Sequence, residues 1–168
     1  MGGADKPIVA KLVIIASNLT KGAGFFELIP DRRYALMKTA RHSHWWEIYD
    51  LQVGRRLTAF KTMETHAGYV DTYALPAAVL IDLIRLTVSV YKDEGVGPSV
   101  IRTGGSIAGG WAGGYVCAQV GYKAGELLGG MLGPNHEGVM AVVFGYLGGV
   151  VGAQYGDKLA RLVLQGEY

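Results

Sequence analysis

The chain has little cysteine and little charge. Its 168 residues include one cysteine, and 18% of them are charged, whereas an average soluble domain has about 25%. One cysteine excludes an internal disulfide framework, and Cys117 falls in a row of small residues where packing explains it. Half of the residues are hydrophobic and the mean hydropathy is positive. The composition is therefore compatible with membrane contact.

Signatures of nucleic-acid and nucleotide binding are also missing. The net charge is only +2, and no basic run alternates with aromatic residues, which argues against a nucleic-acid partner. The glycine-rich run 104–110 has neither the spacing G-x-G-x-x-G nor a Gly-Lys-Ser/Thr ending. It nearly forms a G-x-S-x-G elbow at Ser106, but Ala108 stands at the final position. We therefore expect no cofactor and no bound metal.

The N-terminus lacks a clear export signal. Lys6 and Lys11 flank only the short apolar run 12–16, and no cleavage site follows it. Gly2 does not begin a myristoylation motif, because the sixth residue is Lys6. We expect no cleavable signal peptide, which leaves a cytosolic location, membrane association or export by a specialised secretion system.

Glycine recurs at every fourth residue between residues 104 and 156. Glycine costs about 1 kcal/mol relative to alanine inside a helix, so helices this rich in glycine must regain stability through close packing. Small residues at this spacing let helix backbones touch, and we expect these glycines to mediate helix contact or oligomerisation. The first row is Gly105, Gly109, Gly113, Cys117, Gly121, Gly125, Gly129 and Gly133, and the next segment has two rows, Ala141, Gly145, Gly149, Ala153 and Gly148, Gly152, Gly156, Ala160.

The predicted fold class is α+β, in a single domain over residues 1–168. Short aromatic and β-branched runs at 25–29, 33–39, 44–52 and 57–63 predict three or four antiparallel strands, whereas 8–19 fits either a strand or a helix. A turn is expected at 21–24. Helical periodicity then predicts a helix over 76–93, which begins at Pro76 and pairs Asp82 with Arg85. We thus expect a mixed head over 1–75 and a helical part over 76–168, with a glycine-zipper hairpin over 104–165.

The hairpin has a distinctive geometry. The loop 133–138 permits only an antiparallel arrangement, with a second helix from Glu137 to about residue 165, capped by Asn135 or Glu137. Each step of four residues turns a helix by about 400°, so the row drifts by about 40° per step. Such a row either crosses its partner steeply or meets several neighbours, and we favour several neighbours. A bulky face of Trp111, Tyr115 and Tyr122 lies roughly opposite the early glycines, which leaves the bare face for contact.

Side chains that could take part in catalysis or bind a metal lie close in sequence to the first two tryptophans. His42 and His44 would share one face of a strand, with Glu47 close in sequence and His66 in the next connection. If the chain has a catalytic site, we expect it there, with Asp50 and Asp71 as orienting carboxylates. The alternative is solvent-facing histidines at a turn, because H-x-H alone lacks a third metal ligand.

Membrane contact has its own candidates. The segments 103–122 and 139–153 are uncharged and approach the ~20 residues that cross a bilayer, although Arg102 and Lys123 bound the first closely. The tryptophans Trp45, Trp46 and Trp111 are candidates for the membrane interface. Trp45 and Trp46 also suit the core of the small sheet.

One resemblance accompanies these patterns. The run Gly104-Gly105-Ser106-Ile107-Ala108-Gly109-Gly110-Trp111-Ala112-Gly113-Gly114, continued to Gly156, resembles the glycine-zipper hairpins of bacterial secreted effectors, polymorphic toxins and membrane-active domains. The resemblance covers roughly the last third of the chain. It implies a membrane-inserting or pore-forming hairpin delivered by a specialised secretion route.

Three functions follow as hypotheses. The first is a membrane-active protein that inserts or oligomerises through its hairpin, with a lipid bilayer and other copies of itself as partners. The second is a non-enzymatic, self-assembling structural subunit that packs copy against copy in water. The third is an enzyme with its site at His42, His44, Glu47 and His66.

Overall fold

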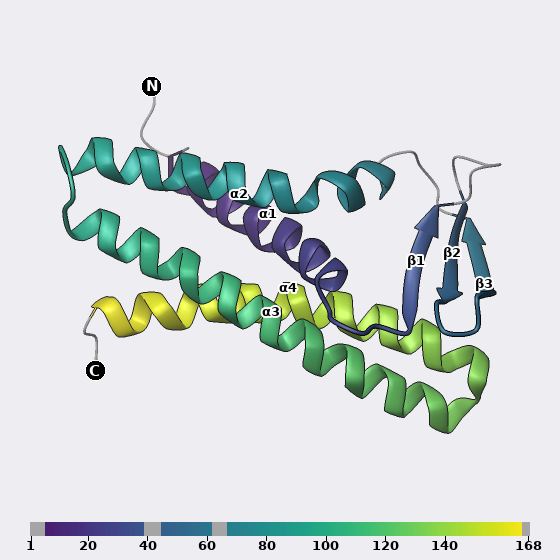
Figure 1. The fold of residues 1–168 in the computed structure, drawn as a ribbon. Coiled ribbons are helices and arrows are strands. Elements are labelled where there is room, and N and C mark those ends of the chain that lie inside the picture. Colours follow the sequence, from purple (N-terminus) through teal and green to yellow (C-terminus); the bar gives the residue numbers. More distant parts are fainter. Residues whose placement is uncertain (1–5, 39–44, 62–66, 166–168) are drawn as a thin grey trace.

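The computed structural model describes residues 6–38, 45–61 and 67–165. These residues form four helices and a three-stranded antiparallel sheet (Figure 1). The α+β prediction is confirmed in its coarse form, because helices dominate, the small sheet lies in the N-terminal half and the C-terminal helices pack together. The elements are α1 (Lys6–Glu27), β1 (Tyr34–Lys38), β2 (Trp45–Asp50), β3 (Arg55–Lys61), α2 (Ala67–Lys92), α3 (Pro98–Leu132) and α4 (Pro134–Gln165).

Consecutive helices run in opposite directions. The start of α1, the link between α2 and α3, and the end of α4 lie at one end of the bundle, which we call the terminal end (Figure 1). The sheet and the turn between α3 and α4 lie at the other end, the sheet end. With 35 residues, α3 is about 52 Å long, so the α3–α4 pair extends well beyond the thickness of a bilayer core.

Helix α1 corrects the predicted turn at 21–24 and the predicted strand at 25–29, since it continues through both to Glu27. Its buried residues recur with helical spacing at Ser17, Asn18, Lys21, Gly24 and Phe25. Three of these buried residues, Ser17, Asn18 and Lys21, are polar, so the buried face does not appear as a helical repeat of apolar residues in the sequence. Gly24 packs against Leu75 of α2, where an added Cβ would lie 2.6 Å from Cδ2 of that leucine.

Helix α2 begins at Ala67, nine residues before the predicted start at Pro76. Proline lacks an amide hydrogen and favours the first helical turn, which was the reason for the prediction, but here Pro76 lies inside the helix. The helix thus runs across the boundary drawn at residue 76 between head and helical part. The predicted Asp82–Arg85 pair is confirmed, with 2.9 Å between Oδ1 and Nη1.

The sheet has the order β1-β2-β3, with Tyr34 opposite Asp50 and Lys38 opposite Trp46. Three strands match the predicted runs, and the fourth run, 25–29, is no strand, because its first three residues belong to α1. The sheet packs on the beginning of α4, because an added Cβ on Gly138 would lie 2.9 Å from Cδ1 of Tyr34. The Tyr34 amide also donates a hydrogen bond to the Tyr122 hydroxyl on α3, at 2.8 Å.

Helices α3 and α4 are joined by Gly133 alone, which has a φ of 121° that favours glycine. Helix α4 begins at Pro134, three residues before the predicted start. The amides of His136 and Glu137 bond to the Gly133 carbonyl, and Glu137 pairs with Arg33. Nothing is described for the side chain of Asn135, the other predicted cap.

The first glycine row meets α4 along most of its length. An added Cβ on Gly109 would lie 2.5 Å from the Gly156 carbonyl oxygen. The contacts then advance four residues along α3 for every four residues back along α4. They join Gly113 to Gly152, Gly121 to Phe144 and Gly148, Gly125 to Met140 and Ala141, and Gly129 to His136 and Glu137, whereas Gly105 meets the Leu164 side chain.

One partner helix therefore follows the row from Gly109 to Gly129, and several neighbours are not needed for that row. The two helices cross in projection (Figure 1), so α4 can remain on the drifting row. The adjacent small residues of α3, Gly110 and Gly114, meet α1 as well as α4, with Phe25 beside Gly114. The face with Trp111 and Tyr122 is also in contact, since Tyr122 is fully buried and Trp111 packs on the core, which corrects the expectation that only the bare face makes contacts.

Candidate functional site

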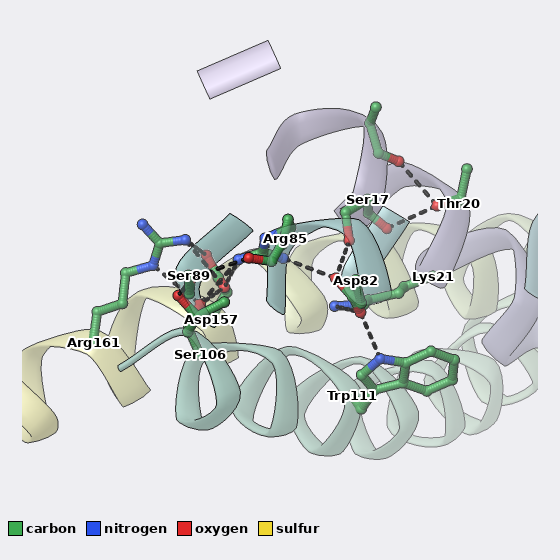
Figure 2. A network of polar contacts seen from close by, with 12 residues as sticks. Ser17, Thr20, Lys21, Asp82, Arg85, Ser89, Ser106, Trp111, Asp157 and Arg161 are labelled. Atoms are coloured by element: carbon green, nitrogen blue, oxygen red, sulfur yellow. Dashed lines mark hydrogen bonds and ion pairs between the residues drawn. The ribbon is translucent and has the colours of Figure 1, made fainter. Parts of the chain in front are cut away.

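A network of charged and hydroxyl side chains lies inside the bundle at the terminal end. All four helices contribute to it (Figure 2). Most of its members are buried although they are the kinds of side chain most often exposed to water. The members, which we call the ionic network, are Ser17 and Lys21 from α1, Asp82, Arg85 and Ser89 from α2, Thr103, Ser106 and Trp111 from α3, and Asp157 and Arg161 from α4.

Asp82 is the centre of one half of the network. Its Oδ2 lies 2.7 Å from Lys21 Nζ, an ion pair whose geometry is not aligned for a hydrogen bond. The Ser17 hydroxyl donates to Oδ1 at 2.9 Å, and the Trp111 indole donates to Oδ2 at 2.8 Å. Asp82 therefore ties α1, α2 and α3 together through one carboxylate.

Arg85 joins this half to α4. Its Nη1 donates to Asp82 at 2.9 Å, and its Nη2 donates to Asp157 and to the Ser106 hydroxyl, both at 3.2 Å. Ser106 also donates to Asp157. Arg161 closes the outer side of the network, with its Nη2 3.1 Å from Asp157 Oδ2 and its Nε donating to Ser106 at 3.1 Å. The guanidinium of Arg85 thus bridges two carboxylates on different helices.

The charges of the interior balance. Lys21, Asp82, Arg85 and Asp157 each have side chains no more than 9% exposed, and they comprise two cations and two anions. The fifth charge, Arg161, is 35% exposed and lies at the rim. Burying an ion is costly unless it is paired and hydrogen-bonded, and each of these ions has an opposite charge within 3.2 Å.

The outer surface of the bundle has the opposite character. On α2, Leu83 is 57% exposed while its neighbour Asp82 is buried, and Tyr91 is 87% exposed. Further large apolar side chains are exposed on α2 and on the two helices of the hairpin. They include Val79, Leu80, Ile84 and Val88 on α2, Val116 and Val120 on α3, and Leu147, Val151, Tyr155, Leu159 and Val163 on α4.

Two segments are long and apolar enough to cross a membrane by length and composition, Ala74–Lys92 in α2 and His136–Leu164 in α4. Only 22% of the first is buried, whereas the core helix of a soluble protein is mostly buried. The sequence had favoured the two arms of the hairpin, and the arm at 139–153 lies within the second of these segments. No segment of α3 is apolar enough to be counted with them, because the many glycines of this arm contribute little hydropathy.

The predicted catalytic cluster is largely outside the described residues, which omit His42, His44 and His66. Glu47 lies on β2 and pairs with Arg56 at 2.9 Å. Asp50 is buried at the end of β2, where it pairs with Arg33 at 2.9 Å and accepts hydrogen bonds from the amides of Gln52 and Val53. Asp71 lies in α2, and nothing is described for its side chain. Among the described residues, no group of three or more His, Cys, Asp or Glu side chains could hold a metal ion.

The surroundings of Asp50 and Tyr34 shift the pKa of each side chain. Burial alone would raise the pKa of Asp50, but the hydrogen bonds from Arg33 and from the amides of Val53 and Gln52 outweigh it and lower the pKa. Burial, and then the hydrogen bond with Glu137, raises the pKa of the Tyr34 hydroxyl well above its ordinary value. Tyr34 interacts with Glu137 of α4, and Asp50 is linked to Glu137 through Arg33, so we assign both groups a structural role.

The predicted interfacial tryptophans separate. Trp111 lies in the bundle, where its indole bonds to Asp82 and packs edge-on against Phe25, with 5.3 Å between ring centres. Trp45 and Trp46 lie on β2, and nothing is described for their side chains. The glycines of the predicted contact rows lie where helices approach closely, and Gly145 packs against Phe26 of α1 and Tyr122 of α3. Gly149 is buried as well.

Sequence reasoning found part of the ionic network. The pairing of Asp82 with Arg85 follows from their spacing on one helix. Lys21 carries no local signal, because its partner Asp82 lies 61 residues away. Asp157 pairs with Arg85 across 72 residues, and its local pair with Arg161, at spacing i, i+4, was not predicted. Comparison of the chain with protein-family models, curated proteins and solved structures gives no match.

Proposed function

We propose that this chain is an integral membrane protein, whose helical bundle lies in a lipid bilayer with its exposed apolar side chains toward lipid and the ionic network inside. The observation that carries the proposal is on α2, which buries Asp82 and Ser89 and exposes Leu80, Leu83 and Val88. In water this orientation would be unfavourable, because it leaves apolar surface in contact with water and removes charged groups from water. In a bilayer it is the favourable orientation, since charged side chains then avoid hydrocarbon.

The helix contacts support the same proposal. Lipid tails are as apolar as leucine, so helices in a bilayer associate through close backbone packing and interhelical hydrogen bonds. The α3–α4 contact uses glycines that meet carbonyl oxygens of the partner helix, and the ionic network supplies polar contacts among all four helices. We propose these glycines as the zipper that holds the hairpin together.

The distribution of charge along α3 gives the depth. Residues 103–122 are uncharged and span about 30 Å, which matches the hydrocarbon core of a bilayer. Lys123 is exposed and pairs with Glu126. Beyond it lie the turn between α3 and α4 and the beginning of α4, on which the sheet packs. The sheet and this turn would then lie outside the membrane, on one side of it.

Resistance to extraction tests the proposal. The protein is synthesised with liposomes of phosphatidylcholine and phosphatidylglycerol, floated, and washed at pH 11. We expect the wild type to stay with the vesicles, and the variant L80D/L83D to be largely lost because two charges would face hydrocarbon, each costing about 2.5–3.5 kcal/mol. The matched control L51D/V53D, on exposed apolar residues of the turn after β2, should be retained.

Two results would contradict the proposal. A wild type that stays in solution as a discrete oligomer without detergent would favour a self-assembling subunit whose copies cover one another's apolar surfaces. Equal retention of both variants would mean that the surface of α2 does not face lipid. Release of trapped dye in the same vesicles separates a protein that damages membranes, as the effector-like resemblance implies, from one that resides in them.

A further inference from the structure

Four exposed cations surround the terminal end of the bundle. They are Lys11 on α1, Lys92 at the end of α2, Arg102 near the start of α3 and Lys158 on α4. Within the described part of the chain, none of the four forms an ion pair or a side-chain hydrogen bond. Each helix therefore presents one cation whose charge is not matched by a carboxylate of the bundle.

The acidic groups that the structure describes at this end are fewer than these cations. Asp93 accepts hydrogen bonds from the amides of Ser99 and Val100, at 2.7 and 3.2 Å. The hydrogen bond with the Ser99 side chain contributes most to lowering the pKa of Asp93, followed by the two amides, with a smaller contribution from Lys92. Asp157 is buried and already shared by Arg85 and Arg161. Glu94 is the remaining exposed carboxylate of the α2–α3 link.

The sheet end is arranged differently. Among the side chains described there, Arg56 pairs with Glu47 at 2.9 Å, Lys123 pairs with Glu126 at 2.7 Å, and Arg33 pairs with Asp50 and Glu137. Arg32 donates to the Phe26 carbonyl. The described cations of this end are thus engaged within the protein, and among the side chains that the structure describes the unmatched positive charge is concentrated at the terminal end.

The four cations lie at similar depth. The Ser89 and Thr103 hydroxyls are 2.7 Å apart, so Lys92 and Arg102 are level with the same turn of α3. Lys158 follows Asp157, which bonds to Ser106 on the next turn. Lys11 precedes Ser17, the partner of Asp82, by six residues. These residues fall within about two helical turns, or about 10 Å, and long basic side chains extend farther along the bundle.

We infer that this band of cations binds the anionic headgroups of phospholipids in the leaflet at the terminal end. The inference rests on the proposed membrane function. At the depth where residues 103–122 enter the hydrocarbon core, lysine and arginine reach outward to the phosphate layer. An anionic lipid then supplies the negative charge that the protein lacks, whereas a zwitterionic lipid supplies no net charge.

Spin-labelled lipids test this in reconstituted vesicles. Lipids in contact with the protein give a motionally restricted component in the electron spin resonance spectrum. We expect that component to favour phosphatidylglycerol over phosphatidylcholine by about fivefold, the factor that corresponds to ~1 kcal/mol for one cation near the surface. The variant K92Q/R102Q/K158Q should bring the ratio near one, and the matched variant R56Q/K123Q at the sheet end should leave it unchanged.

The outcomes separate this inference from the proposed function. A restricted component with no preference for phosphatidylglycerol, or an equal loss of preference in both variants, would overturn the headgroup inference while the bundle remains in the bilayer. A spectrum with no restricted component for either lipid would overturn the membrane proposal itself. Inorganic phosphate should lower the preference no more than sodium chloride of equal ionic strength, and a stronger effect would assign the cations to free phosphate instead.

Discussion

Lys21 and Asp82 form an ion pair inside the bundle, with 2.7 Å between Nζ and Oδ2 and side chains that are 0% and 6% exposed. The next residue of α2, Leu83, is 57% exposed. Charged groups inside and large apolar groups outside reverse the pattern of a soluble helical bundle. This reversal underlies the proposed place of the protein in a bilayer.

The ion pair gives the first prediction. Asp82→Asn removes one of the two buried anions of the ionic network and leaves Lys21 unbalanced, so we expect it to destabilise the bundle by about 3–5 kcal/mol. The double variant K21M/D82N removes one charge of each sign and restores the balance, because Asp157 still pairs with Arg85. Unfolding in detergent micelles should therefore show the double variant to be more stable than Asp82→Asn alone. Additive costs of the two substitutions would mean that Lys21 and Asp82 are not coupled.

The glycine contacts give the second prediction. At Gly113 an added side chain would meet the Gly152 carbonyl, so Gly113→Leu must push α3 and α4 apart, and we expect a loss of about 3 kcal/mol or more. Gly104 lies in the same helix with nothing within 4 Å of an added Cβ. Gly104→Leu should be neutral or slightly stabilising, because leucine favours helix more than glycine does. Thermal unfolding compares them, and equal melting temperatures would show that the row does not hold the hairpin.

The link between sheet and bundle gives the third prediction. Tyr122→Phe removes the acceptor for the buried Tyr34 amide while keeping the ring that packs on Phe26. We expect a cost of about 1–3 kcal/mol in the free energy of unfolding, because the amide would be left unsatisfied. Tyr155→Phe, at a tyrosine that is 67% exposed, is the matched control and should cost little. Equal effects of the two substitutions would contradict the role of the Tyr122 hydroxyl.

The turn after β2 gives the fourth prediction, which concerns pH. Because the pKa of Asp50 is lower in the folded protein than its ordinary value of 3.8, its carboxylate stabilises the sheet above that value. The contribution is lost as the pH falls through the folded pKa. Arg33→Gln should move the Asp50 titration, followed by carboxyl carbon chemical shift, to higher pH. A wild-type midpoint at or above 3.8 would contradict this expectation.

Local patterns in the sequence predicted some elements well and concealed others. The strands and the spacing of the glycine rows depend on neighbouring residues, and these predictions were confirmed or match the contacts in the structure. Helix α1 was missed in part because its buried face carries Ser17, Asn18 and Lys21, which resemble a polar turn until α2 supplies Asp82. Pro76 was taken as a helix start because proline favours the first helical turn, but it lies inside α2. Most of the ionic network depends on partners from different helices, so only the Asp82–Arg85 pair was predicted, and the other local pair, Asp157–Arg161, was missed.

Accessibility of a spin label at Leu83 tests the central proposal most directly. Leu83 and Val53 are 57% and 59% exposed, but one lies on the outer face of α2 and the other in the turn after β2. Single cysteines are introduced at each position in a Cys117→Ser background, labelled and reconstituted in liposomes. We expect the label at Leu83 to collide mainly with oxygen dissolved in lipid, and the label at Val53 with a water-soluble nickel complex. A label at Leu83 that is as accessible to the nickel complex as the label at Val53 would contradict the membrane proposal.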